Sequence, residues 1–188
     1  MARKRMFTKD EILQAAIELT REKGFGAVTA RAIGCKLGTS YRPICSFFES
    51  MAEVQEGVIA AANEIYQSYL AKDMSSGKYP PYKASGMAYI RFAREEKELF
   101  KLLFMRDRRN EGTAKNSEES DMLIDLICKQ VNTPKENAQM FYLEMWIYVH
   151  GIATMIATNY FDWSEELCSQ TLTDMYQGLK LKYENKTE

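Results

Sequence analysis

The sequence has few of the residues from which enzyme active sites are built. Its only histidine is His150, and it lacks a glycine-rich phosphate loop, an HExxH motif and a GxSxG motif. Acid–base, nucleophilic and metal-assisted catalysis usually depend on such groups of residues. Glu144 lies six residues before His150, so on a helix the two side chains point to different faces. We therefore expect a protein that is not an enzyme and that uses no metal or cofactor.

The four cysteines, Cys35, Cys45, Cys128 and Cys168, show no CxxC spacing, and none lies near the histidine. This pattern disfavours a zinc site and favours reduced, partly buried thiols. The basic N-terminal residues are not followed by an apolar stretch of signal-peptide length, so we expect a cytoplasmic protein. The longest apolar region, residues 140–157, contains Glu144 and His150, which favours a buried helix over a membrane span.

Charge is distributed unevenly along the chain, although the formal net charge is only −1. Residues 1–48 carry nine Lys/Arg against four Asp/Glu, and the remainder carries sixteen against twenty-two. A locally basic segment on a nearly neutral chain favours contact with nucleic acid over the behaviour of a general polycation. The length of 188 residues allows one domain, or a small domain joined to a larger one.

The N-terminal segment shows the start and stop signals of consecutive short helices. Thr8 and Glu11 form the signature of a capping box at the start of a first helix, and Gly24 ends it. Thr29 can cap a second helix, and Gly38 allows a tight turn after it. A third helix follows, capped by Thr39 or Ser40. A helix, a tight turn and a second short helix form the outline of a helix-turn-helix DNA-binding motif.

The side chains along this motif carry hydroxyl and guanidinium groups that can bind phosphates and base edges. A basic arm at residues 3–5 precedes the first helix. It is either a solubilising terminus or a further contact with phosphate or the minor groove. We expect DNA contacts from Arg3, Lys4, Arg5, Thr29, Arg31, Thr39, Ser40, Tyr41, Arg42 and Ser46.

Residues 7–54, FTKDEILQAAIELTREKGFGAVTARAIGCKLGTSYRPICSFFESMAEV, resemble the N-terminal domain of TetR-type transcriptional regulators. The matching features are the G-F-x-x-x-T sequence before the second helix, the L-G-T-S turn and the aromatic pair before the fourth helix. The later segments YIRFAREEKELFKLLFM and VHGIATMIA resemble the body of the same family. The resemblance implies an all-α protein of about nine helices. It divides the chain into a three-helix DNA-binding domain at residues 1–50, a connecting helix at about 50–72, and a ligand-binding and dimerisation domain at 51–188.

The DNA-binding segment departs from the family pattern at several positions. Cys45 replaces the tyrosine that usually binds phosphate, Ser46 takes the place of the following His or Tyr, and Met51 replaces a lysine. Pro43 lies within the third helix, where only the first turn tolerates it. Gly34 replaces the usual alanine and should weaken the second helix by about 0.5 to 1 kcal/mol.

The C-terminal third of the chain contains two long apolar helices. Residues 133–136, TPKE, resemble a second capping box and open a helix to about residue 160 that is apolar almost all round. A last helix runs from residue 163 or 164 to about 183. Two adjacent apolar helices favour an isologous four-helix contact between two copies. We expect Tyr148, Ile152, Met155, Leu172, Met175 and Leu179 at this dimer interface.

The resemblance also implies an effector pocket inside the helical body. An apolar pocket with a few polar groups suits a small hydrophobic or aromatic molecule. His150 is either a donor to that ligand or a core histidine bonded to a carbonyl group. The expected pocket residues are Tyr89, Phe92, Phe104, Met122, Tyr142, Trp146 and His150.

The function implied by the resemblance is that of a DNA-binding transcriptional regulator. We expect a repressor that is released from a palindromic operator by its ligand and that acts as a homodimer without a membrane partner. The departures at Cys45 and Met51 keep an alternative open: a degenerate TetR-fold module that dimerises and binds a ligand or a protein, with weak or no DNA binding.

Overall fold

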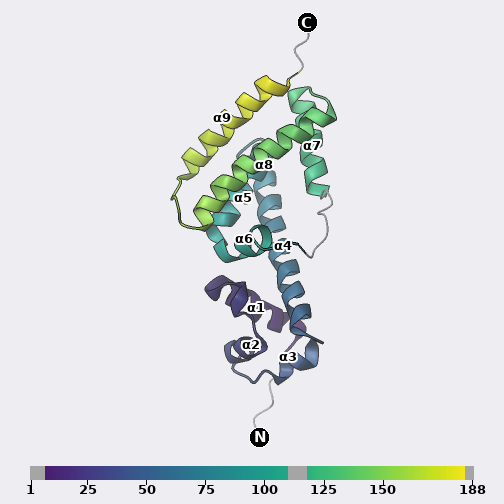
Figure 1. Ribbon diagram of the computed structural model, residues 1–188, viewed down its shortest axis with the longest axis vertical. Helices are drawn as coiled ribbons and strands as arrows, with labels where there is room; N and C mark the ends of the chain where they lie inside the picture. The colour runs from purple at the N-terminus through teal and green to yellow at the C-terminus, as the bar shows by residue number, and fades with distance from the viewer. Residues whose placement is uncertain (1–6, 110–117, 185–188) are drawn as a thin grey trace. The chain divides into compact units, whose positions relative to one another are not determined.

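The computed structural model describes residues 7–109 and 118–184, and these ranges form helices and connecting segments without a strand (Figure 1). The prediction of an all-α protein with about nine helices is therefore confirmed for the described residues. The helices are α1 (Lys9–Lys23), α2 (Ala30–Lys36), α3 (Arg42–Phe47), α4 (Met51–Ser75), α5 (Pro81–Glu95), α6 (Lys97–Phe104), α7 (Glu118–Val131), α8 (Lys135–Ala157) and α9 (Glu165–Tyr183), with a 3₁₀ turn, η1 (Phe25–Ala27), after α1.

The chain divides into two compact units. The first contains the described residues up to Gln67 together with Glu96–Arg106, and the second contains Ser68–Glu95 and the described residues from Asp107 onward. The first unit therefore includes most of α4 and all of α6, which packs against α1. This division by contacts differs from the boundary near residue 50 that the sequence predicts for the DNA-binding domain. That residues 1–50 form the DNA-binding domain stays a prediction. The connecting helix, expected to end at about residue 72, ends at Ser75.

Local capping explains where the helices of the first unit begin. Thr8 and Glu11 form a complete capping box at α1, as predicted, and the Thr29 side chain accepts a hydrogen bond from the amide of Ala32 at the start of α2. The predicted cap of α3 is wrong, because Tyr41 is its N-cap residue and makes no side-chain capping bond. Ser40 Oγ only accepts a long bond of 3.4 Å from the amide of Arg42.

The cap of α8 also differs from the prediction. Pro134 is the N-cap residue of α8 and provides no side-chain capping bond. The Thr133 hydroxyl instead donates to the carbonyl of Tyr183 at 2.7 Å, across to the end of α9. Thr133 is only 7% exposed, so its hydroxyl needs a partner within the protein, and the Tyr183 carbonyl that provides it lies too far along the chain for local sequence patterns to indicate it.

The core of the second unit forms around α8, which packs against α5, α7 and α9 (Figure 1). Phe92 of α5 and Phe141 of α8 are fully buried there. By length and composition α8 alone among the described helices is apolar enough to span a membrane, but its packing against three helices is that of a core helix.

Candidate nucleic-acid interface and ligand site

The turn between α2 and α3 is closely packed against α2. Gly38 adopts a φ of 67°, in the left-handed region that favours glycine. The amide of Thr39 donates to the carbonyl of Gly34 at 2.8 Å. A Cβ atom at Gly34 would lie 2.8 Å from the carbonyl oxygen of Ser40. The missing side chain of Gly34 therefore lets the turn that carries α3 approach the second helix.

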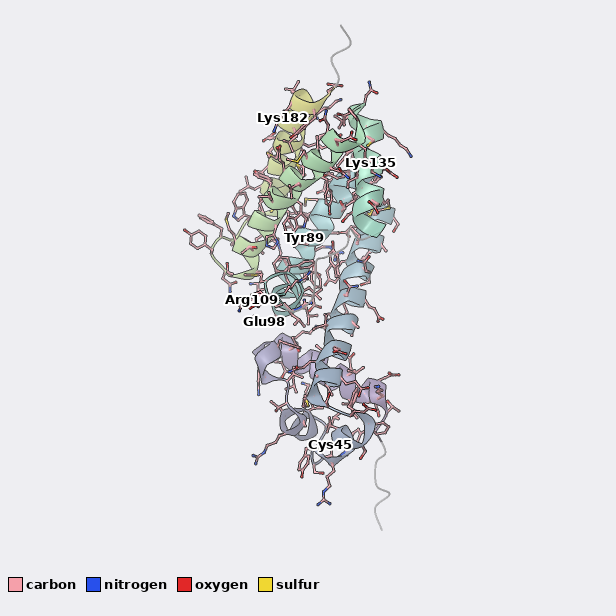
Figure 2. The ribbon with its side chains drawn as sticks, turned by 45° about the vertical axis from the view of Figure 1, so that its right-hand side comes forward. Cys45, Tyr89, Glu98, Arg109, Lys135 and Lys182 are labelled. Atoms are coloured by element: carbon pink, nitrogen blue, oxygen red, sulfur yellow. The ribbon has the colours of Figure 1, made fainter. Side chains whose placement is uncertain are left out.

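Ile44 and Phe48 hold α3 in place, since both are at most 5% exposed. Opposite them the helix is open to solvent: Arg42, Cys45 and Ser46 are exposed, and Figure 2 shows Cys45 at the outer end of this unit. Ser46 donates its hydroxyl to the carbonyl of Arg42 at 3.0 Å. The helix therefore presents a surface of polar and thiol groups opposite its buried side.

Most predicted DNA-contacting residues within the described ranges lie on the surface. Thr29, Arg31, Ser40, Tyr41, Arg42 and Ser46 are exposed, and Thr39 is partly exposed. The predicted arm of Arg3, Lys4 and Arg5 lies outside the described residues. Two exposed side chains of α3, Cys45 and Phe47, were not among the predicted contacts. Cys45 follows the buried Ile44 by one residue, which turns it away from the buried side, whereas the spacing of three residues between Ile44 and Phe47 gives no sign that Phe47 is exposed.

The cations of the first unit fall into two groups. Lys36 pairs with Glu22 at 2.7 Å and with Glu18 at 3.2 Å, and the hydrogen bond that Lys36 donates to Glu22 raises the pKa of Lys36. Arg31 and Arg42 are exposed and form no ion pair with the residues that the structure describes. Two guanidinium groups on the α2–α3 surface thus have no ion-pair partner among the described residues, and phosphate is one of the anions that arginine binds well.

In the second unit, three predicted pocket residues come together between α5 and α8. Tyr89 Oη lies 2.9 Å from His150 Nδ1, and the Trp146 ring stacks on the His150 ring at a centroid distance of 5.0 Å and an angle of 9°. Figure 2 labels Tyr89 within this unit. Burial lowers the pKa of His150, so the ring is neutral near pH 7. His150 is thus bonded to a tyrosine hydroxyl, and its predicted role as a donor to a ligand stays a prediction.

One turn further along α8, the hydroxyl of Thr154 is buried and has no hydrogen-bond partner among the described residues. A buried unpaired hydroxyl is uncommon and marks either an unfilled binding site or a local loss of stability. Tyr89 and His150 are bonded across α5 and α8, and Thr154 lies four residues after His150 on α8. Sequence reasoning did not identify Thr154, although its spacing of four residues from His150 places it on the same face of α8.

The other predicted pocket residues lie elsewhere in the two units. Phe92 is fully buried and packs edge-on against Tyr69, and the Tyr142 hydroxyl lies 3.2 Å from Ser120 Oγ on α7. Met122 is 43% exposed on α7. Phe104 belongs to the first unit, where its ring packs on Tyr66. Their membership in a single ligand pocket stays a prediction.

Half of the predicted dimer residues require correction. Ile152, Leu172 and Leu179 are at most 6% exposed, because α5, α8 and α9 of the same chain cover them. They form core contacts within one chain and offer no surface to a second copy. Tyr148, Met155 and Met175 are partly exposed. The exposed apolar side chains of the same two helices are instead Met140, Leu143, Trp146, Ile147, Leu167 and Leu181.

Taken together, the short helices α1 to α3 and the larger helical unit around α8 define a helix-turn-helix regulator. The family model described as bacterial regulatory proteins, tetR family, matches residues 12–57. The model described as the tetracyclin repressor-like C-terminal domain matches residues 82–177. The chain belongs to the TetR family of transcriptional regulators.

Solved structures share the fold over nearly the whole chain. A TetR-like transcriptional regulator from Rhodococcus sp. RHA1 has a TM-score of 0.68 and 15% sequence identity, over 93% of this chain and 96% of that chain. A TetR variant from Acinetobacter baumannii AYE, solved in complex with minocycline, has a TM-score of 0.55 and 12% identity, over 95% of this chain and 99% of the other. Comparison with curated protein sequences found no match.

Proposed function

We propose that this regulator is a cytoplasmic, non-enzymatic repressor that binds a palindromic operator as a homodimer. The observation that carries the proposal is the pair of exposed guanidinium groups of Arg31 and Arg42 on the α2–α3 surface, which have no ion-pair partner among the described residues. Arg42 stands opposite the buried Ile44, where a side chain of α3 would enter the major groove. Two copies related by a two-fold axis would read half-sites about 34 to 36 Å apart.

Replacing Arg42 by alanine should weaken binding to an operator selected from a random duplex library. An arginine that contacts a guanine contributes about 1 to 3 kcal/mol of discrimination, so we expect about a 5- to 100-fold loss of affinity and a relaxed preference at one base pair. Fluorescence anisotropy at several salt concentrations measures both effects. Arg31→Ala should instead weaken all sequences alike and reduce the salt slope by about one.

Arg109→Ala is the matched control, because Arg109 is an exposed arginine of the second unit that pairs with Asp107. It should leave DNA affinity unchanged. If the wild-type protein selects no sequence and binds DNA without salt sensitivity, the regulator has lost its DNA-reading function. The exposed thiol at Cys45, in place of a phosphate-binding hydroxyl, would then favour the degenerate ligand-binding module.

We further propose that the effector binds beside Tyr89, His150 and Thr154. The three polar groups are neutral at pH 7, and the surrounding residues of α5 and α8 are largely apolar. This chemistry suits an uncharged, hydrophobic or aromatic molecule with one or two hydrogen-bonding groups. The buried hydroxyl of Thr154 supports the assignment, because a ligand oxygen or nitrogen would supply the partner that it lacks.

Thr154→Val tests this assignment through stability. A methyl group in place of an unpaired buried hydroxyl should raise the free energy of unfolding of the ligand-free protein by about 1 kcal/mol. Thr133→Val is the matched control: the buried Thr133 hydroxyl donates to the carbonyl of Tyr183, so its loss should lower stability by about 1 to 2 kcal/mol. Urea unfolding measures both. In a thermal-shift screen of neutral aromatic compounds, a stabilising ligand should protect the wild type more than Thr154→Val.

A lower stability of Thr154→Val would mean that the hydroxyl has a partner in the folded chain. Equal protection of wild type and variant by every binding compound would place the effector elsewhere.

The homodimer is proposed to form through the outer faces of α8 and α9. Only 39% of the most apolar 18-residue stretch of α8 is buried within one chain. At Gly151 of α8 and Gly178 of α9, a Cβ atom would meet no described residue within 4 Å beyond its own stretch of helix. Glycine inside a helix costs about 1 kcal/mol relative to alanine, and close approach of a second helix would account for its use here. If the ligand binds less tightly to the arrangement of the two copies that binds DNA, it lowers their affinity for DNA. By linkage, bound DNA then lowers the affinity for the ligand by the same factor.

A further inference from the structure

The exposed apolar face of α8 includes the ring that stacks on His150. Leu143, Trp146, Ile147 and His150 follow the spacing i, i+3, i+4 and i+7, which places them on one face of a helix. Leu143, Trp146 and Ile147 are 44%, 41% and 58% exposed. Trp146 therefore belongs to the surface of α8 rather than to the interior of a pocket, although its ring covers one side of His150.

From this surface a short series of contacts leads into the core. The Trp146 ring lies parallel to the His150 ring, and His150 Nδ1 is bonded to the hydroxyl of Tyr89. Tyr89 is only 5% exposed on α5. Three residues thus connect the outer face of α8 with a buried side chain of the helix packed beneath it.

The same face of α8 suits a second copy of this chain. Between Ala138 and Ala157 Glu144 is the only Asp, Glu, Lys or Arg, and its carboxylate is bound by Lys182 at 2.7 Å. The hydrogen bond from Lys182 lowers the pKa of Glu144, which keeps the carboxylate ionised and paired. An isologous contact places each residue near the same surface of the other copy, so a face without free charge is self-complementary.

We propose that Trp146 and His150 lie in the contact between the two copies, and that the Tyr89–His150 hydrogen bond links this contact to α5. The inference rests on the proposed dimer. The effector site and the subunit interface then share His150. A ligand that binds the Tyr89 hydroxyl or the His150 ring changes the position of His150, on which the Trp146 ring stacks. It thereby changes the affinity of the two copies for one another.

The test uses the two tryptophans of the chain, Trp146 and Trp163. In a Trp163→Phe background, Trp146 is the only indole. Its emission should shift to shorter wavelength as protein concentration rises, with the same midpoint as the dimer dissociation constant from sedimentation. Tyr89→Phe removes one hydrogen bond to His150 and should raise that dissociation constant by about 2- to 10-fold. Tyr82→Phe, a buried tyrosine of α5 that contacts Phe141 and Tyr176 instead, should leave it unchanged.

The possible outcomes separate this inference from the proposal on which it rests. A protein that is monomeric at every concentration overturns the proposed dimer itself. A dimer whose formation leaves Trp146 emission unchanged keeps the dimer but removes Trp146 from the interface. A blue shift with equal dissociation constants for wild type and Tyr89→Phe places Trp146 in the interface and overturns the link to α5.

Discussion

A Gly34→Ala substitution is expected to lower the free energy of unfolding by about 1 to 2 kcal/mol, although helix propensity alone predicts a gain of about 1 kcal/mol. The added Cβ would lie 2.8 Å from the carbonyl oxygen of Ser40, 2.9 Å from its carbonyl carbon and 3.1 Å from the carbonyl oxygen of Thr39. These are backbone atoms of the turn, so the contact cannot be relieved by rotating a side chain. The turn itself must move, and α3 with it.

Chemical unfolding of Gly34→Ala, followed by circular dichroism, measures the change in stability. Gly26→Ala is the control, because it lies in the same unit and a Cβ atom there would meet nothing within 4 Å. Its stability should stay within about 0.5 kcal/mol of the wild type. DNA affinity should fall for Gly34→Ala and remain unchanged for Gly26→Ala. A more stable Gly34→Ala protein would show that the turn can move away without loss.

Gly34 also shows where sequence reasoning ends. From the sequence alone, a glycine in a helix is expected only to lower the stability of that helix, because helix propensity describes the helix without its neighbours. The structure reverses that reading: the glycine permits a close contact between residues five and six positions apart. Such a contact depends on the direction of the chain after Gly38, and no local pattern contains that direction.

Caps formed by neighbouring residues could be predicted, and caps that depend on tertiary contacts could not. The capping box of Thr8 and Glu11 is local, and it forms as expected. The same signature occurs at Ser50 and Glu53, where Ser50 Oγ accepts from the amide of Glu53 at 3.2 Å and begins α4. Thr133 matches the pattern equally well, but its hydroxyl binds a carbonyl fifty residues away. Competition from a distant partner is invisible in the sequence.

The same limit separates the two candidate sites. The α2–α3 surface is built from one short segment, so spacing and residue type predicted most of the side chains of the described part that face outward, although they missed Cys45 and Phe47. To predict the ligand site and the dimer interface in the second unit, one must know which side of α8 packs against α5 and which side remains exposed. Its apolar residues surround the helix almost completely, and periodicity therefore gave no direction. For this reason the sequence predicts Ile152 at the dimer interface, although the structure buries Ile152 within one chain and exposes Ile147.

Ile147→Glu is expected to convert the protein into a monomer. Ile147 is 58% exposed in one chain, so the substitution should change the stability of the monomer by less than about 0.5 kcal/mol. In a dimer joined through α8, the carboxylate would be buried in the apolar contact, and the two-fold axis would place it there twice. An unpaired buried charge costs about 3 to 5 kcal/mol, which corresponds to at least about a 100-fold weaker dimer.

DNA binding should report the same change independently. A monomer binds only one half-site. A dimer holds a second DNA-binding domain beside the other half-site, which typically raises the affinity for DNA by about 10² to 10⁴, and the monomer loses this gain. Sedimentation and anisotropy on the selected operator measure the two effects.

Met122→Glu is the matched control, since Met122 belongs to the same unit and is 43% exposed on α7. It should remain dimeric and bind DNA normally. A dimeric Ile147→Glu protein would place the interface on another surface, and a monomeric variant with unchanged DNA affinity would mean that each copy reads its operator alone.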